Sequence, residues 1–443
     1  MSTTAPSTPR PRPIQRRIYM DANATTPLLP EVFDAMRPFL LESFGNPSSI
    51  HQQGQRARAA VDKARDAVAR LLHVKSSEIV FTSGGTESDN LALFGVLNSG
   101  DHLITSAIEH HAVLHAAEAL AQRGVEVTFL PCDAAGIVSP AALAAALRPH
   151  TRLVSIMFAN NETGVIQPIA ELAAIAKAHG ALFHTDAVQG AGKIPMDLSP
   201  SGPLAGIDLL SLSGHKMYAP QGTGVLFVRH GLKLAPLFHG GTHERQRRAG
   251  TENVAGIVAL GKAADLAAAW MATDLGAPSF PAPSERVGYR AEGSTALTSD
   301  YQEASSPATL AALRDHLEQS LLAQLPACGV NGAGAPRTAN TANLYFDHVE
   351  AEALVITLDL NGLSVSGGSA CQSGASEPSH VLTAMGLSPA QARASIRISL
   401  SRMTTPEEVD DAIRIIASSV NQLRSISRTW KAAQESSTAL ASA

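Results

Sequence analysis

Short β-rich runs alternate with Ala- and Leu-rich stretches, and this alternation is the feature that most restricts how the chain can fold. The β-rich runs read EIVFTSG, HLITSA, EVTFLPC, RLVSIMF, ALFHTDA, LLSLSG and GVLFVR. One intervening stretch, residues 168–180, carries apolar residues at helical spacing and ends on Gly180, a typical helix stop. Strand–helix–strand alternation predicts a largely parallel α/β sheet, in which ligands bind at the carboxyl ends of the strands.

Composition narrows the class of protein. The 443 residues leave room for up to about three domains. A net charge of −5 argues against direct binding of nucleic acid, and the absence of any run of 18 apolar residues argues against a membrane span. Cys132, Cys328 and Cys371 lie far apart, so they form neither a zinc-binding spacing nor a disulfide framework. We therefore expect a cytoplasmic enzyme.

Three segments depart from the alternating pattern. Residues 1–17 are rich in Ser, Thr, Pro and Arg, and their prolines forbid the amphipathic helix of a transit peptide, so we expect a disordered tail. Residues 277–307 are polar and rich in Pro and Ser, which predicts a long inserted loop, disordered rather than functional. The last residues of the chain are expected to fray.

The first polar cluster is Ser83-Gly84-Gly85-Thr86, which ends a β-rich run just before a helical stretch. Glycines allow close backbone approach, and a helix N-terminus offers free N–H groups, so this cluster could cradle a phosphate. No lysine follows at the Walker A spacing. By itself the cluster is more often only a tight turn.

Two further clusters follow later runs. Asp186 follows one run and could partner a protonated ring nitrogen, although alone it would be read as a solvated carboxylate. Lys216 follows another and could form a Schiff base with an aldehyde, although alone it would be read as a surface charge. A phosphate cradle, an aspartate and a lysine together are what pyridoxal 5′-phosphate (PLP) requires.

At this point the chain resembles the cysteine desulfurases, PLP enzymes of the class V aminotransferase group. The likeness covers roughly residues 18–420, and its Cys-bearing run is similar to the group with the longer catalytic loop. The matching runs are YMDANATTP, FGNPSSIHQQG, FTSGGTESDN, IEHHAV, NNETGVIQP, HTDAVQ, SLSGHKMYAPQGTG, RAGTEN, SGGSACQSGASEPSHVL and SIRISLSR.

The resemblance implies a role for each matching position. Lys216 would hold PLP, Asp186 would pair with its ring nitrogen, and Gln189 would hydrogen-bond its phenolic oxygen. His110 would stack on the ring and shuttle protons. The phosphate would be bound by Gly85, Thr86, Ser213 and His215, and by Thr251 from the other subunit, so a homodimer is implied. Asn161 and Arg397 would hold the substrate carboxylate.

Cys371 is the residue on which the implied activity depends. It lies in a Gly- and Ser-rich stretch without apolar neighbours, whereas Cys132 and Cys328 fit the ordinary pattern of inert cysteines. Its thiolate would attack the sulfur of L-cysteine and leave L-alanine and a persulfide on Cys371. The persulfide sulfur would pass to an iron–sulfur scaffold, a tRNA-thiolating enzyme or both.

The resemblance also implies the architecture, a type I aminotransferase-like α/β fold. The large PLP-binding domain would span residues 33–265, and a smaller α+β domain would combine 18–32 with 266–443. The cofactor would lie between them, against the partner subunit.

Other interpretations remain open at this point. A sister PLP activity, such as selenocysteine lyase or an aminotransferase of small amino acids, would use the same fold, but a transaminase has no need of Cys371. A scaffold that lost catalysis would not need the site residues at all. His111 and His115 stand four apart, yet no H-E-x-x-H pattern or further ligand set accompanies them, so we expect no metal.

Overall fold

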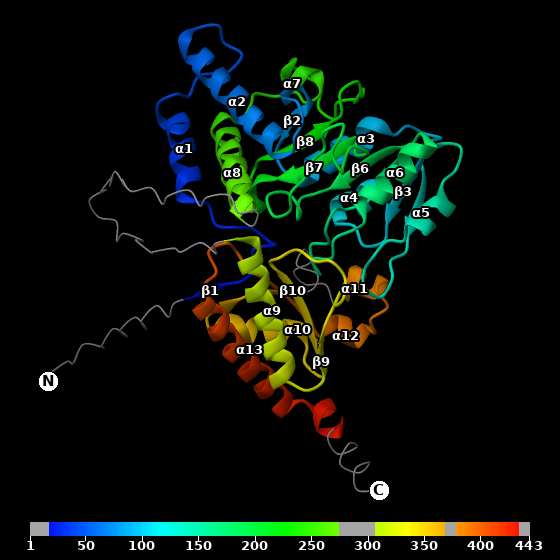
Figure 1. The fold of residues 1–443 in the computed structure, drawn as a ribbon, viewed down its shortest axis with the longest axis vertical. Helices are drawn as coiled ribbons and strands as arrows, with labels where there is room; N and C mark the ends of the chain where they lie inside the picture. Colours follow the sequence, from blue (N-terminus) through cyan, green and yellow to red (C-terminus); the bar gives the residue numbers. More distant parts are fainter. Residues whose placement is uncertain (1–16, 274–305, 368–377, 434–443) are drawn as a thin grey trace, which may run out of the picture.

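The described residues form a seven-stranded and a four-stranded β-sheet, one in each of the two bodies seen in Figure 1, and a further two-stranded sheet, β1-β11. The structure is a computed structural model and describes residues 17–273, 306–367 and 378–433. Cys371, the tail before residue 17 and nearly all of the 277–307 insertion lie outside these ranges. The disorder predicted for the tail and the insertion therefore stays a prediction.

The larger sheet has seven strands in the order β2-β8-β7-β6-β5-β3-β4. All neighbours run parallel except β8, which is antiparallel to both β2 and β7. The strands are the seven predicted runs: β2 (Ile79–Thr82), β3 (His102–Ser106), β4 (Glu126–Leu130), β5 (Thr151–Ser155), β6 (Leu182–Asp186), β7 (Leu209–Ser213) and β8 (Gly224–Val228). The largely parallel sheet is thereby confirmed.

Helices connect these strands and cover both faces of the sheet. Successive side chains of a strand point to opposite faces, so Val80 joins the apolar cluster under α3 and α4, while Phe81 joins the main core. Gly180 ends α6 in the left-handed conformation, at a φ of 88°, as the sequence predicts. The helices are α1 (Pro30–Leu41), α2 (Gln52–Leu71), α3 (Gly85–Val96), α4 (His111–Ala121), α5 (Pro140–Ala146), α6 (Ile169–His179), α7 (His243–Gln246) and α8 (Val254–Ala272), with short 3₁₀ turns η1 (Ser76–Glu78) and η2 (Gly214–Lys216).

The smaller sheet is antiparallel, in the order β12-β13-β10-β9. The chain start joins this body, because β1 pairs in parallel with β11 and Asp21 bridges to Ser399. Its elements are β1 (Ile18–Tyr19), α9 (Pro307–Gln324), β9 (Cys328–Val330), β10 (Thr341–Phe346), α10 (Ala351–Leu360), β11 (Leu363–Ser364), β12 (Ser366–Gly367), α11 (His380–Ala384), α12 (Pro389–Arg393), β13 (Ser395–Ser399) and α13 (Pro406–Ile426).

The boundary predicted between residues 265 and 266 falls inside α8. This helix continues to Ala272 and packs on α1 and α2, so the helical layer of the larger body runs past the expected division. Among the described residues, α8 is the one helix long and apolar enough to cross a membrane. Its buried Leu260, Ala263 and Ala267 account for that composition as core packing.

Candidate active site

A cavity of about 340 Å³ lies where β6 and β7 end, facing the segment that follows β1. Every predicted site residue except Thr251 and Cys371 lines it. Its walls are Asn23, Ala24, Gly85, Thr86, Asp89, His110, Met157, Ala159, Asn161, Asp186, Val188, Gln189, Ser213, His215, Lys216 and Arg397. The expectation that polar clusters converge at the carboxyl ends of the strands is confirmed.

Lys216 enters the cavity from η2, the tight turn that follows β7. Its Nζ donates hydrogen bonds to the backbone oxygens of Asn23 and Ala24, each at 2.6 Å. These carbonyls belong to a segment almost two hundred residues earlier in the chain. They hold the amine at the cavity wall, where it is placed to react with a carbonyl group.

Asp186 is the last residue of β6, and its carboxylate is buried. Its Oδ1 accepts a hydrogen bond from the Val188 N–H at 2.9 Å. Burial raises the pKa of Asp186 to about 6, although the positive charge of Lys216 works in the opposite direction. A cationic N–H partner would stabilise this carboxylate, so the position suits a protonated ring nitrogen.

Two more buried carboxyl groups, Asp89 and Glu109, lie near Asp186, and Asp89 also lines the cavity. Burial, and then the neighbouring charge of Asp186, raise the pKa of Asp89 well above its ordinary value. Burial raises the pKa of Glu109 to about 8, although its Oε1 accepts hydrogen bonds from Ser106 and Met157. The sequence analysis assigned no role to Asp89 or Glu109. Both lie inside runs that match the family, FTSGGTESDN and IEHHAV, so the motifs carried a signal that was not used.

The N-terminus of α3 forms the predicted cradle. A Cβ on Gly85 would come within 2.7 Å of Val188 Cγ2, so only glycine lets the backbone lie this close. The first N–H groups of a helix have no partner within it and attract anions. Ser213 and His215 line the same cavity, and a Cβ on Gly85 would lie 3.7 Å from the Ser213 Cβ. Burial, with the charge of Lys216, lowers the pKa of His215 to about 4, so His215 lines the cavity as a neutral imidazole.

His110 forms the N-cap of α4 and lines the cavity. Its Nδ1 accepts a hydrogen bond from the Ala112 N–H at 3.1 Å, so a neutral ring carries its proton on Nε2. Burial and the charge of Lys216 lower the pKa of His110 to about 4. The ring is therefore neutral at physiological pH and carries its one proton on Nε2.

Arg397 reaches the cavity from β13 of the smaller sheet. It is buried, and its guanidinium donates to Asp21 Oδ1 at 2.8 Å and to the Asn161 backbone oxygen at 3.1 Å. Its Nε has no hydrogen-bond partner within the described ranges. A planar cation held in this way matches a carboxylate, which agrees with the role that the resemblance implies.

Thr251 does not reach the cavity of its own chain, and its side chain is exposed.

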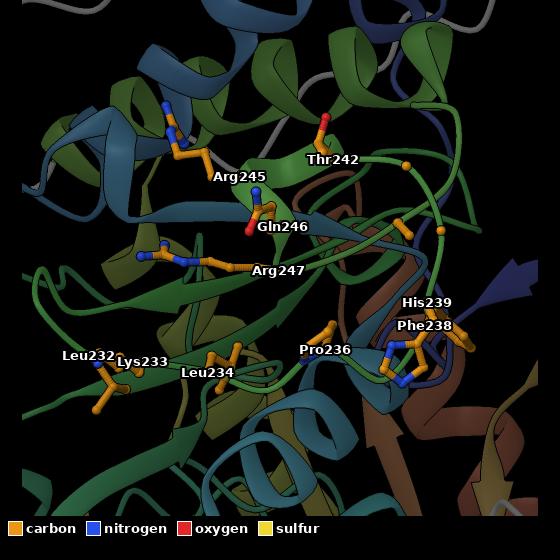
Figure 2. A pocket seen from close by; sticks show the side chains of 13 residues that line it. Leu232, Lys233, Leu234, Pro236, Phe238, His239, Thr242, Arg245, Gln246 and Arg247 are labelled. Atoms are coloured by element: carbon orange, nitrogen blue, oxygen red, sulfur yellow. The ribbon is translucent and has the colours of Figure 1, made fainter.

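A second hollow, of about 570 Å³, is lined by residues between 232 and 249, just before Thr251 in the chain. Leu232 and Lys233 lie at one end of it, and Phe238 and His239 lie at the other (Figure 2). It is larger than the cavity at Lys216, but no predicted site residue lines it. The predicted contact of Thr251 with a second subunit stays a prediction.

The backbone beside this hollow is anchored by one buried ion pair. Residues 244–246 have positive φ angles of 49°, 57° and 66°, a conformation that side chains other than glycine rarely adopt. The Arg65 guanidinium pairs with both oxygens of Glu244 at 2.7 Å, and the Phe81 N–H donates to Glu244 at 3.0 Å. These contacts hold the strained turn in place.

Three histidines next to His110 lie close together with their rings tilted against one another. The ring centroids of His111 lie 5.0 Å from His115 and 4.8 Å from His380. Within the ranges that the structure describes, no group of three or more His, Cys, Asp or Glu side chains could hold a metal ion.

The cavity fits PLP on the chemistry of its own residues. Lys216 offers the amine, Asp186 a buried carboxylate for the ring nitrogen, and the cradle at Gly85 the N–H groups for a phosphate. A side chain on Gly85 would clash with Val188 and disturb the phosphate cradle, so the position requires glycine.

Comparisons with known proteins agree with this arrangement. The model of the aminotransferase class V family matches residues 18–276 and 294–411. Cysteine desulfurase IscS of Methanosarcina thermophila is 45% identical over 416 residues, which cover 93% of this chain and 94% of the relative. Cysteine desulfurase IscS of Dictyoglomus turgidum is 43% identical over 425 residues, 94% and 99% of the two chains.

Solved structures give the same picture. A NifS-like protein has a TM-score of 0.77 at 34% identity, covering 91% of this chain and 98% of its own. SspA in complex with cysteine has a TM-score of 0.70 at 34% identity, covering 88% and 100%. The unmatched residues 277–293 of the family comparison fall within the predicted insertion.

Proposed function

The chain belongs to the class V aminotransferase family, and we propose that within it the chain acts as a PLP-dependent cysteine desulfurase. It converts L-cysteine into L-alanine and leaves a persulfide on Cys371. The observation that carries this function is one cavity that combines Lys216, Asp186 and the buried Arg397. A transaminase would use the first two, but Cys371 adds the sulfur acceptor.

Each residue of the cavity has a different role in the proposed reaction. Bound PLP supplies an electron sink for the carbon that loses sulfur. Lys216 holds the cofactor through its amine, and Asp186 keeps the ring nitrogen protonated. Arg397 binds the substrate carboxylate and so orients the cysteine side chain. His110, neutral and with its proton on Nε2, moves a proton between substrate and solvent.

The sulfur transfer then balances as follows. The Cys371 thiolate attacks the sulfur of the substrate, so an S–S bond forms while the substrate C–S bond breaks. The electron pair of that bond remains with the substrate carbon, which takes up a proton and becomes the methyl group of alanine. No external oxidant or reductant is needed until the persulfide is discharged.

The direct test measures alanine formed from L-cysteine with a reductant present. We expect the wild type and the Cys132→Ala control to produce alanine, and Cys371→Ala to produce none. Alanine from Cys371→Ala would show that another group takes the sulfur. A PLP-loaded wild type that forms no alanine would favour a sister activity or a scaffold.

We also propose that the protein is a homodimer in which Thr251 completes the other subunit's site. Its support is that Thr251 is exposed and lies outside its own cavity. Mixed dimers of Lys216→Ala and Thr251→Ala chains separate the possibilities, after light scattering has established the mass. If Thr251 acts across subunits, one site in each mixed dimer regains both residues and activity returns. If it acts within its own chain, the mixture stays defective.

The acceptors of the persulfide sulfur are proposed to be an iron–sulfur scaffold, a tRNA-thiolating enzyme or both, in the cytoplasm. The support is the name IscS borne by relatives and the scarcity of cysteines in this chain. Transfer of radiolabelled sulfur from the Cys371 persulfide to each purified acceptor tests the choice. An acceptor that gains no label is excluded.

A further inference from the structure

Lys193 is a second lysine close to the cavity, and the proposed mechanism does not use it. It lies in the turn after β6, four residues beyond Gln189, where the Lys193 N–H bonds the Gly190 oxygen. Its Nζ donates to Gln189 Oε1 at 2.7 Å and to Asn23 Oδ1 at 3.3 Å. The turn therefore places the ammonium group directly behind the Gln189 amide.

These contacts determine which way the Gln189 amide points. Lys193 Nζ lies against the amide oxygen as a donor, and in its protonated form it has no acceptor to offer the amide nitrogen. The opposite side agrees, because Gln189 Nε2 donates at 3.1 Å to the Asn23 backbone oxygen, which can only accept. One N–H of Nε2 is then left for the cavity that Gln189 lines. Gln189 thus presents a donor rather than an acceptor to a bound ligand.

Asn23 connects this pair to Lys216. The Asn23 backbone oxygen accepts both Gln189 Nε2 and Lys216 Nζ, the latter at 2.6 Å. The Asn23 side chain is itself fixed, since its Oδ1 accepts from Asn340 at 3.0 Å and its Nδ2 donates to Thr341 at 2.9 Å. A change at Lys193 is therefore transmitted through a rigid, buried residue.

The charges around Lys193 are mostly positive. Lys216 and Arg397 face it, with Asp21 paired to Arg397, and Arg402 lines the same small cavity of about 20 Å³. In the part of the chain that the structure describes, no carboxylate lies within ion-pairing distance of its Nζ. Burial, and then Lys216 and Arg397, lower the pKa of Lys193 to about 7. Keeping a cation in this place without a counterion has a cost, which the two amide acceptors offset only in part.

We propose that Lys193 is a positioning residue that holds the Gln189 amide with its N–H toward the phenolic oxygen of the cofactor. This inference rests on the proposed function. With the N–H in place, and a positive charge behind it, negative charge on that oxygen is stabilised. Without Lys193 the amide can turn its carbonyl oxygen into the cavity, where it would repel the same oxygen.

The consequence is a change in the acidity of the Lys216 nitrogen once it holds the cofactor. Loss of the donor that faces the phenolic oxygen favours retention of the proton on this nitrogen to higher pH, and loss of the Lys193 charge adds to this effect below about pH 7, where Lys193 is still protonated. The midpoint of the pH titration of the visible absorption band should therefore rise. We expect about one pH unit, because one unit corresponds to about 1.4 kcal/mol, which is the scale of one hydrogen bond.

The experiment titrates the visible band of the PLP-loaded protein from about pH 6 upward, and circular dichroism at each pH checks that the protein stays folded. Lys193→Met is compared with Lys193→Arg, which keeps the charge and the donors, and with Lys63→Met, which removes an exposed lysine of α2. The expected result is a raised midpoint in Lys193→Met alone. If that variant does not fold, Lys193→Gln replaces it, since glutamine can donate or accept and no longer selects one amide orientation.

A loaded Lys193→Met, or Lys193→Gln, with the wild-type midpoint overturns the inference and leaves the proposed function intact. A midpoint in Lys193→Arg displaced as far as in Lys193→Met also overturns it, because the donors would then not matter. A wild type that develops no visible band with added PLP overturns the proposed function first. The spectrum therefore separates the two failures.

Discussion

The two sheets contribute unequally to one cavity. The seven-stranded sheet supplies Asp186 and Ser213 from its strand ends, Lys216 from the turn after β7, and the cradle at the start of α3. The four-stranded sheet supplies Arg397 to the described lining. The first group suits a cofactor, and the second suits the substrate carboxylate.

The interiors behind these residues differ as well. Near Asp186 lie carboxyl groups whose pKa values are raised by burial, so that side of the cavity favours protonated, neutral carboxyl groups. Arg397 is instead held by an anionic partner, Asp21, before any substrate binds. Because the two sides of the cavity are built differently, a mutation on the Asp186 side should mainly change the cofactor chemistry, and a mutation at Arg397 should mainly change substrate binding.

The largest effect is expected from Lys216→Ala on the seven-stranded sheet. The cofactor loses its covalent attachment and the cavity loses an amine that takes part in the reaction. Alanine formation should fall by roughly 10³-fold or more, and the visible band should disappear. Stopped-time alanine assays and absorbance spectra measure both, with Lys63→Ala as the control. A variant that keeps the lysine-type spectrum would show that another amine holds the cofactor.

Asp186→Asn should have the next largest effect. The amide has nearly the shape of the carboxylate but cannot keep a ring nitrogen protonated. We expect kcat to fall by about 10²- to 10³-fold while PLP remains bound. Rapid kinetics on the loaded variant provide the measurement. A variant with near wild-type kcat would remove Asp186 from the chemistry and weaken the contrast between the sheets.

Arg397→Lys tests the other side of the comparison. A lysine keeps the charge but loses the planar fork that binds a carboxylate through two hydrogen bonds. KM for L-cysteine should rise roughly tenfold or more, the scale of one charged hydrogen bond, with a smaller change in kcat. Arg393→Lys, an exposed arginine near the same strand, is the control. A fall in kcat at constant KM would place Arg397 in the chemistry and break the comparison.

Much of the larger sheet could be predicted because its signals are local. Each β-rich run and each Ala/Leu stretch reports its own periodicity, so the seven strands and α6 appear where the sequence predicts them. The antiparallel direction of β8 could not be predicted, because a run of apolar residues does not show whether the strand runs parallel or antiparallel to its neighbours. The boundary predicted between residues 265 and 266 falls inside α8, because one continuous helical pattern extends over both sides of it.

The sequence motifs predicted the residues that line the candidate site, but not the residues that hold those side chains in position. Gly85, Asp186 and Lys216 follow strand ends and carry recognisable chemistry. Asn23 joins Lys216, Gln189 and Lys193, yet its partners lie more than a hundred residues away, so only the folded chain reveals its position. Lys193 did have a weak local signal, its spacing of four residues from Gln189. Thr251 lies outside the cavity of its own chain, and Cys371 lies outside the described ranges, so the structure tests neither of their predicted roles.

The smallest expected effect concerns the buried carboxyl groups of the larger body. Burial raises the pKa of Glu109 from its ordinary 4.5 to about 8, so between these values the folded chain holds a proton that the unfolded chain has released. The contribution of Glu109 to stability is therefore complete below pH 4.5 and is lost as the pH rises through 8. In Glu109→Gln this dependence should vanish, which removes a slope of up to about 1.4 kcal/mol per pH unit.

Urea unfolding at pH 6, 7 and 8 measures this slope, with Glu118→Gln, an exposed glutamate of α4, as the control. We expect the free energy of unfolding of Glu109→Gln to change less with pH than that of the wild type, while Glu118→Gln follows the wild type. Equal slopes in all three proteins would mean that Glu109 is ionised in the folded state. The larger body would then hold a compensated charge, as Arg397 does in the smaller one, and the contrast between the two interiors would be lost.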